Sequence, residues 1–109
     1  MTTETDEERD LRWAVDALKE ISNITQDMMR GLGRKIHEHV HSNLVLIDTC
    51  KNQPEMNLRR ALRVLTEIRD MIDPTAGGIS KPVRFQAENA ITHIAIAQAA
   101  RRAGDNRTS

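Results

Sequence analysis

Apolar residues recur at steps of three and four residues along most of this 109-residue chain. This spacing is typical of amphipathic helices, because residues three and four apart lie on one helix face. No segment shows the strict alternation of a half-buried strand. A chain of this length can bury one core in one ordinary domain. We therefore predict an all-α bundle of three to four helices forming a single domain, 1–109, with disordered ends at 1–5 and 105–109.

The apolar stripe runs without interruption from Leu11 to Ile47, across Gly31 and Gly33. A turn at the glycines would place two basic residues at the start of a new helix, where the helix dipole disfavours cations. Two glycines inside a helix cost about 2 kcal/mol relative to alanine. We expect one long N-terminal helix, straight or kinked, and keep a helical hairpin as a near-equal alternative.

Capping and helix-breaking residues mark the other boundaries. Thr5 or Asp6 can cap the first helix, whose first turns are acidic. Pro54 is expected in the first turn of another helix, which ends at Asp73–Pro74. The last helix is expected to stop at Gly104. The residues of this last helix expected to face inwards are Phe85, Ala87, Ala90, Ile91, Ile94 and Ala95.

The net charge of zero hides an uneven distribution. Residues 1–27 hold eight acidic and three basic residues, whereas residues 74–109 hold two acidic and five basic ones. Two helices of opposite charge packed side by side explain this pattern more readily than a charged tail. The polar N-terminus, the lone Cys50 and the lack of an apolar run of roughly 20 residues predict a cytoplasmic protein without a membrane anchor.

The string His37-Glu38-His39-Val40-His41 matches the pattern H-E-x-x-H. On a helix, His37 and His41 lie one turn apart and could bind zinc, with Glu38 as a general base. On these five residues the segment resembles the zincin metalloprotease signature, which implies a zinc-binding hydrolase. No third histidine follows at metzincin spacing. The other candidates for a third ligand are Glu55, Glu67 and His93.

Histidines that flank a buried helix face explain the same string without a metal. We therefore predict no catalytic residue, no metal and no cofactor, and we keep the zinc-binding hydrolase as an alternative function. Cys50, which has no supporting context for a nucleophile, is expected to be a partly buried small apolar residue.

Arg59, Arg60 and Arg63 form a basic cluster, and arginines one turn apart can contact successive phosphates. The zero net charge, the scarcity of aromatic residues, and the presence of Glu55 and Glu67 at ion-pairing spacing weigh against a nucleic-acid surface. A helical DNA-binding regulator therefore remains an alternative function only.

Several apolar residues fall outside the main stripes. A chain of this size has a limited interior, so a second apolar face is typical of a surface that contacts another chain. Trp13 is expected to contribute most, because a large rigid aromatic ring is a strong interface anchor. The predicted protein interface comprises Trp13, Met28, Met29, Leu32, Leu46 and Ile96.

These observations favour a non-enzymatic regulatory protein that acts by helix-mediated binding to another protein. One example is an anti-activator or inhibitor that occupies the dimerisation or ligand-binding surface of a transcription factor. The same apolar surface also predicts a homodimer. We expect neither nucleic acid nor a membrane among the partners.

Overall fold

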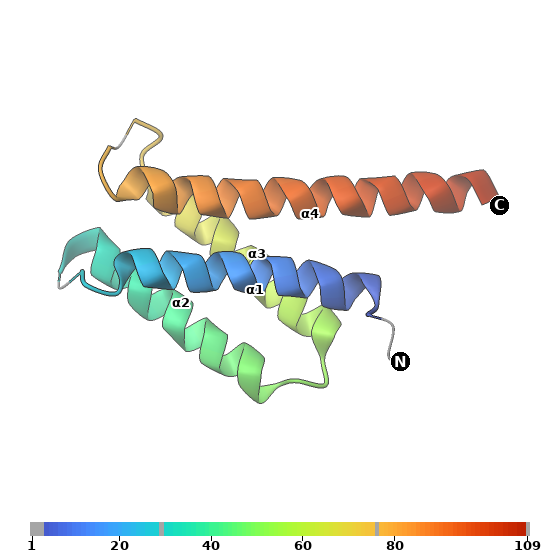
Figure 1. Cartoon of the computed structure of the whole chain (residues 1–109), viewed down its shortest axis with the longest axis horizontal. Helices are drawn as coiled ribbons and strands as arrows, with labels where there is room; N and C mark the ends of the chain where they lie inside the picture. Colours follow the sequence, from blue (N-terminus) through green and yellow to red (C-terminus); the bar gives the residue numbers. More distant parts are fainter. Residues whose placement is uncertain (1–3, 29, 76, 109) are drawn as a thin grey trace.

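Four helices follow one another along the chain, joined by short turns. The computed structural model describes residues 4–28, 30–75 and 77–108, with side chains described up to residue 103. Within these residues it is 83% helical and has no strand, which confirms the predicted all-α bundle. The helices are α1 (Asp6–Thr25), α2 (Gly31–Thr49), α3 (Pro54–Met71) and α4 (Ser80–Thr108) (Figure 1).

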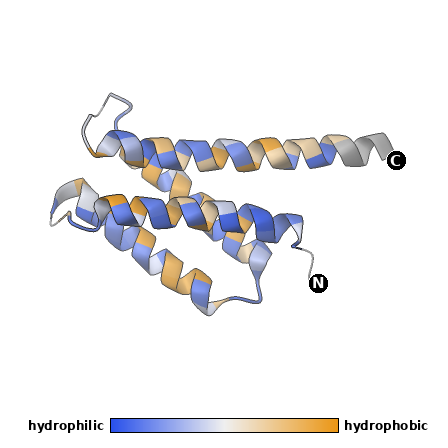
Figure 2. Cartoon of the chain, in the orientation of Figure 1, coloured by the Kyte–Doolittle hydropathy of each residue, from blue (hydrophilic) through white to orange (hydrophobic). Residues whose placement is uncertain are grey.

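Helices α1 and α3 form the centre of the bundle. They pack against each other and against both remaining helices, and α2 and α4 lie on opposite sides of this pair (Figure 1). Apolar and polar residues alternate around each helix, so that the apolar sides meet in one core (Figure 2). No helix of the described part is both long and apolar enough to cross a bilayer. The largest fully buried apolar side chains are Leu18, Ile21, Val40, Val64, Leu65, Ile68, Ile72, Val83 and Ile94.

The chain reverses between α1 and α2, so the long helix expected across the glycines is wrong and the hairpin is adopted. Gly31 has φ of 75°, a left-handed conformation that side-chain-bearing residues disfavour. Gly33 packs on Met28, where an added Cβ would lie 2.6 Å from Met28 Cε. A basic first turn costs less than about 1 kcal/mol, whereas burial of Ile36 and Val40 contributes about 2 kcal/mol each. The free energy gained by burying these two side chains therefore exceeds the cost of a basic first turn.

Polar side chains close the next two joints. Asn57 Nδ2 donates to the carbonyl of Cys50 at 2.6 Å, just after α2 ends. Arg84 Nη1 donates to the carbonyls of Arg69 and Ile72, at 2.8 and 2.6 Å, where α3 ends. The last carbonyls of a helix have no partner within that helix. At both turns a side chain of the following helix adds a donor to these carbonyls.

The two ends of the chain were expected to be disordered. Residues 1–3 and 109 lie outside the described residues. Thr5 caps α1 by accepting the backbone N–H three residues further on, at 3.1 Å. Helix α4 continues through Gly104 to Thr108, so its expected end at the glycine is wrong. One glycine costs a helix about 1 kcal/mol and does not by itself terminate it.

Helix α4 buries a different face from the one expected. Val83, Ala87 and Ile94 are buried, whereas Phe85 is 62% exposed and Ala95 is also exposed. Residues two apart point to nearly opposite sides of a helix, so Phe85 and Ala87 cannot both face the core. The expectation that Phe85 and Ala95 face inwards is therefore wrong.

A buried ion pair joins the ends of α1 and α4. Asp10 is fully buried, and its Oδ2 accepts a hydrogen bond from Arg101 Nη2 at 2.6 Å. Arg101 Nε also lies 3.4 Å from Asp6. The hydrogen bond to Asp10 is the main cause that raises the pKa of Arg101 above its ordinary value. These contacts confirm the expectation that helices of opposite charge pack side by side.

We expect Arg101→Ala to lower the free energy of unfolding by about 2 kcal/mol, because it leaves Asp10 buried without its cation. The double variant Asp10→Leu/Arg101→Met should recover most of this loss, since an apolar pair has no charge to desolvate. Urea unfolding measures both. Arg63→Ala, on the exposed side of α3, is the control and should change stability by less than about 0.5 kcal/mol. Equal losses in Arg101→Ala and Arg63→Ala would contradict the role of the ion pair.

Gly31→Ala should destabilise the protein by about 1 kcal/mol, because alanine is strained at the positive φ of this position. Gly77→Ala is the matched control: its φ is not positive and no atom lies within 4 Å of the added Cβ. The control should leave stability unchanged or raise it slightly. Thermal unfolding of the two variants distinguishes them, and a neutral Gly31→Ala would argue against the hairpin turn.

Candidate functional site

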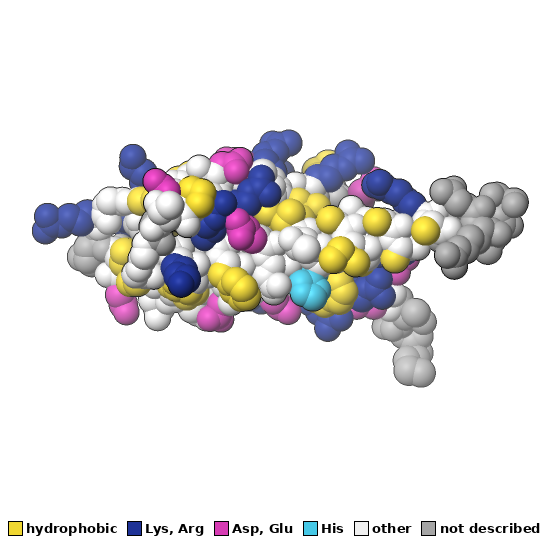
Figure 3. Space-filling model, turned by 90° about the horizontal axis from the view of Figure 1, so that it is seen from above, with side chains coloured by type: hydrophobic (Ala, Val, Ile, Leu, Met, Phe, Trp, Pro, Cys, Tyr) yellow, Lys and Arg dark blue, Asp and Glu magenta, His cyan; other side chains and the backbone are white. Residues whose placement is uncertain are grey.

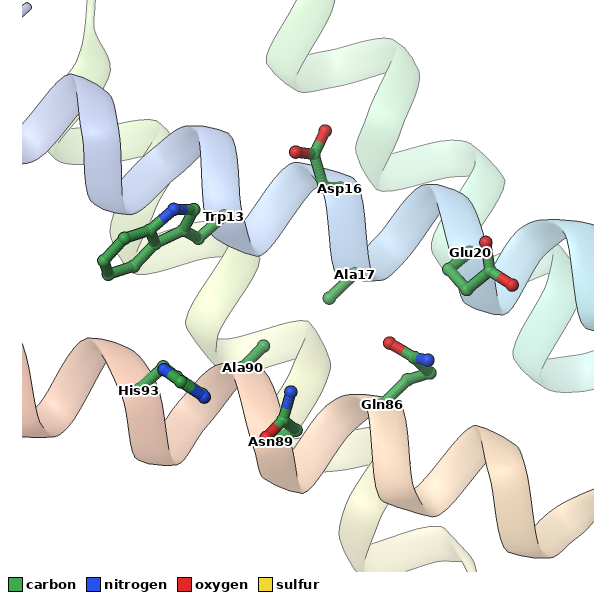
Figure 4. A pocket seen from close by; sticks show the side chains of 8 residues that line it. All are labelled: Trp13, Asp16, Ala17, Glu20, Gln86, Asn89, Ala90 and His93. Atoms are coloured by element: carbon green, nitrogen blue, oxygen red, sulfur yellow. The ribbon is translucent and has the colours of Figure 1, made fainter.

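An open groove of about 550 Å³ lies between α1 and α4. The two helices run antiparallel at this point, and the small side chains of Ala17 and Ala90 face each other across the groove (Figure 4). Glu20 of α1 and Gln86 of α4 lie opposite one another at one end of it. Both alanines are buried at the floor of the groove, where their short side chains let α1 and α4 lie close together.

Trp13 occupies the other end of the groove and is held by residues from both helices. Its ring meets the His93 ring edge-on, with 6.3 Å between centroids and 74° between planes. The guanidinium of Arg9 lies over the indole, 5.5 Å from its centroid. The indole nevertheless remains 36% exposed. Trp13 is therefore an oriented aromatic side chain that still presents apolar surface to solvent.

The two walls of the groove differ in charge. The α1 wall carries the exposed acids Asp16 and Glu20, and neither forms an ion pair within the described residues. Asp16 is turned to the outer side of α1 (Figure 4). The α4 wall carries Gln86, Asn89 and His93, none of which is acidic. The groove therefore has one negative wall and one wall that hydrogen-bonds without a negative charge.

The structure does not bring the predicted interface residues together. Trp13 lies in the groove, and Ile96 is exposed on α4. Leu32 and Leu46 are exposed as well, but at opposite ends of α2. Fourteen residues of helix separate those two, about 20 Å. Sequence periodicity identified side chains outside the core and could not assign them to one surface.

Two predicted interface residues differ from the rest. Met28 is half-buried beside Gly33, and Met29 lies outside the described residues. The predicted interface leaves out five other exposed large apolar residues, although Val45 and Met71 also lie outside the main apolar stripes of the sequence. The sequence holds a signal for Phe85 too, because apolar positions of residues 80–103 occur all around the helix. The five residues are Val45, Met56, Met71, Ile79 and Phe85.

His37 and His41 lie on one face of α2, as the motif predicts. Their rings are parallel within 7°, with centroids 6.3 Å apart. One zinc ion about 2 Å from a nitrogen of each ring would require the rings to move together. Glu38 forms an ion pair with Arg34 at 2.9 Å. No three metal-ligating side chains converge anywhere in the part of the chain that the structure describes.

The other contacts of the histidines are structural. Thr25 Oγ1 donates to the carbonyl of Ile21 at 2.8 Å and lies 3.2 Å from His37 Nδ1. Because the hydroxyl hydrogen is already used, Nδ1 of His37 is assigned as the donor of the second bond. His39 Nε2 lies 3.3 Å from a carboxylate oxygen of Glu67, across the α2–α3 contact. The histidines thus join α2 to its neighbours on both sides.

The arginine cluster is divided between two sides of α3. Arg59 and Arg63 are exposed one turn apart, whereas Arg60 is half-buried on an adjacent side. Arg59 forms an ion pair with Glu55 at 3.0 Å, as the spacing indicated. Glu67, the other acid at that spacing, contacts α2 instead. The three guanidinium groups therefore do not form one uniform basic surface.

Comparison with known proteins finds no similarity: no family model, no curated protein and no solved structure matches the chain. Its function is therefore inferred from the geometry and chemistry of its own residues.

We expect zinc to bind weakly, through His37 and His41 alone, and to be lost in His41→Ala. Glu38→Gln should leave zinc binding unchanged, because Glu38 is paired with Arg34 rather than directed at an ion. Isothermal titration with zinc measures both variants. Stoichiometric tight zinc, together with a hydrolytic activity abolished by Glu38→Gln, would instead favour the hydrolase.

Proposed function

We propose that this chain is a non-enzymatic regulatory protein that binds a helix of a partner protein in the α1–α4 groove. The observation that carries this proposal is the alanine floor between Trp13 and the acidic wall. An apolar floor with an aromatic anchor at one end is the usual chemistry of a groove that accepts an amphipathic helix.

The dimensions of the groove suit a helix. Trp13 and Glu20 are two turns apart on α1, about 10 Å along its axis. Small residues such as Ala17 and Ala90 allow a third helix to approach the two backbones closely. Such a helix would bury the exposed part of the indole and complete the packing of α1 and α4 on their outer side.

Charge defines the partner further. Glu20 at the edge of the groove, with Asp16 one turn before it on the outer side of α1, favours a helix that carries lysine or arginine. Apolar residues of that helix, three and four residues apart, would face the alanine floor. The proposed partner segment is therefore a basic amphipathic helix.

A protein that acts by occupying a helix regulates by competition. The helices through which transcription factors dimerise or enclose a ligand are amphipathic surfaces of this kind, and we propose one of them as the target. The chain would then act as an anti-activator or inhibitor in the cytoplasm. The division of the arginine cluster and the two-ligand histidine pair give less support to the DNA-binding and zinc-hydrolase alternatives.

The test is capture of the partner from the cells that produce this protein, repeated with matched variants. Trp13→Ala should weaken binding about 30-fold, the effect of losing an anchor worth about 2 kcal/mol. Glu20→Lys should also weaken it, and more strongly at low salt, because it reverses one charge of the acidic wall.

The controls are Leu46→Ala and Asp48→Lys, which make similar changes on the exposed side of α2. Both should retain the partner. A partner lost in Leu46→Ala and kept in Trp13→Ala would place the binding surface on α2 and overturn the proposal. A synthetic peptide of the captured protein's basic helix should compete for the groove.

A further inference from the structure

The outer side of α4 carries a line of uncharged residues that no other helix covers. Its members follow one another at alternating steps of four and three residues, and every one is exposed. We call this line the α4 seam. It consists of Phe85, Asn89, Thr92, Ile96, Ala99 and Ala103.

The seam holds the two most exposed large apolar side chains of the described residues. Phe85 is 62% exposed and Ile96 is 63% exposed. Seen from above, apolar side chains lie on this face of the molecule among polar and charged ones (Figure 3). Within the seam, the polar residues Asn89 and Thr92 lie between Phe85 and Ile96. Large apolar side chains that stay exposed on one helix face are typical of a contact with another chain.

The spacing of the seam identifies the shape of its partner. Alternating steps of four and three residues repeat every seven residues, as in helices that pair along their whole length with every seam residue facing the other helix. The opposite side of α4 is already buried against α1 and α3 through Val83, Ala87 and Ile94. Because the fold holds α4 helical, pairing along the seam requires no new helix nucleation.

Charges beside the seam identify the partner itself. One edge of the seam carries Glu88, Ala95 and Arg102, at intervals of seven residues. Ala95 lies midway between the two charged residues. If two copies of α4 pair antiparallel about Ala95, Glu88 of each copy faces Arg102 of the other. If they pair parallel, this edge faces the opposite edge, which carries Gln86, His93 and Ala100 and offers no acid. Only the antiparallel arrangement pairs both charges.

Glu88 is available for such a contact although it already has one partner. Its Oε1 forms an ion pair with Arg84 Nη2, 2.9 Å away, within the same chain. A carboxylate has two oxygens and can accept several hydrogen bonds. Arg102 is exposed, on the side of α4 away from the core.

We infer that this protein forms a homodimer by antiparallel pairing of the α4 seams of two copies, with two symmetric contacts between Glu88 and Arg102. This inference does not depend on the proposed function, because only Asn89 of the groove-lining residues belongs to the seam. Trp13, Asp16 and Glu20 lie on α1, outside the seam.

Light scattering and sedimentation equilibrium of the full chain test the dimer. Ile96→Glu should weaken dimerisation at least about 30-fold, because it places a charge in the middle of the apolar seam. Val45→Glu is the matched control: Val45 is similarly exposed, but on α2, and its substitution should leave the dimer intact. A wild-type chain that stays monomeric at millimolar concentration, or a dimer that survives Ile96→Glu, would overturn the inference.

Charge reversal tests which residues meet. Arg102→Glu and Glu88→Lys should each weaken the homodimer about tenfold, because each places two pairs of like charges opposite one another. An equal mixture of the two variants should dimerise again, since every contact then joins opposite charges. Arg102→Glu does not disturb the Arg84 contact, so it remains informative if Glu88→Lys fails to fold. A mixture that stays monomeric would exclude the Glu88–Arg102 contact.

Spin labels test the direction of pairing. In a Cys50→Ser background, labels at Lys81→Cys should lie about 40 Å apart in the antiparallel dimer, since each is fourteen residues from Ala95. A parallel dimer would bring them to within about 15 Å, roughly the separation of paired helices plus the label arms. The short distance would overturn the antiparallel arrangement.

The Ile96→Glu monomer should still capture a groove partner, which separates the failure of this inference from the failure of the proposed function.

Discussion

The hydrogen bond between Arg101 and buried Asp10 determines how α4 lies on the rest of the bundle. It joins the last helix to the first turns of α1 and, with the buried face of Val83 and Ile94, fixes which side of α4 is turned inwards. Both surfaces described above depend on that orientation. The groove exists because α1 and α4 lie side by side, and the α4 seam is exposed because the opposite side of the helix is occupied.

Polar side chains at the turns between helices determine how each helix is placed against the one before it. Asn57 and Arg84 each donate to carbonyls at the end of the helix before them, and His37 meets Thr25 at the turn between α1 and α2. Apolar packing alone allows one helix to slide along another. A short hydrogen bond to a particular atom does not allow such sliding, so these three contacts set the register of each helix against the one that precedes it.

Local signals in the sequence were sufficient for much of the fold. The caps at Thr5 and Pro54 act within a few residues, and both helices begin where these residues place them. The apolar stripe that continues across Gly31 indicated one long helix, although the two interior glycines of such a helix cost more than a basic first turn does. Burial of Ile36 and Val40 of α2 adds further free energy in favour of the hairpin, and this packing carries no local signal.

The site was less predictable than the fold for the same reason. The sequence indicated that Trp13 and Ile96 lie outside the core. Their surroundings depend on how α4 packs on α1, and residues far apart in sequence meet in that contact: Asp10 and Arg101 are 91 positions apart. His93 beside Trp13 carries no local signal. Phe85 was assigned to the wrong side of its helix because alanines on several sides of α4 leave the buried face undefined until its partner helices are known.

The contact between Trp13 and His93 has a spectroscopic consequence. Trp13 is the only tryptophan of the chain, and the chain has no tyrosine, so its near-ultraviolet fluorescence arises from one indole at the end of the groove. Transfer of the ring from water into an apolar contact shifts the emission to shorter wavelength. The unlabelled protein therefore contains an optical reporter of the groove, sensitive to any helix that covers the indole.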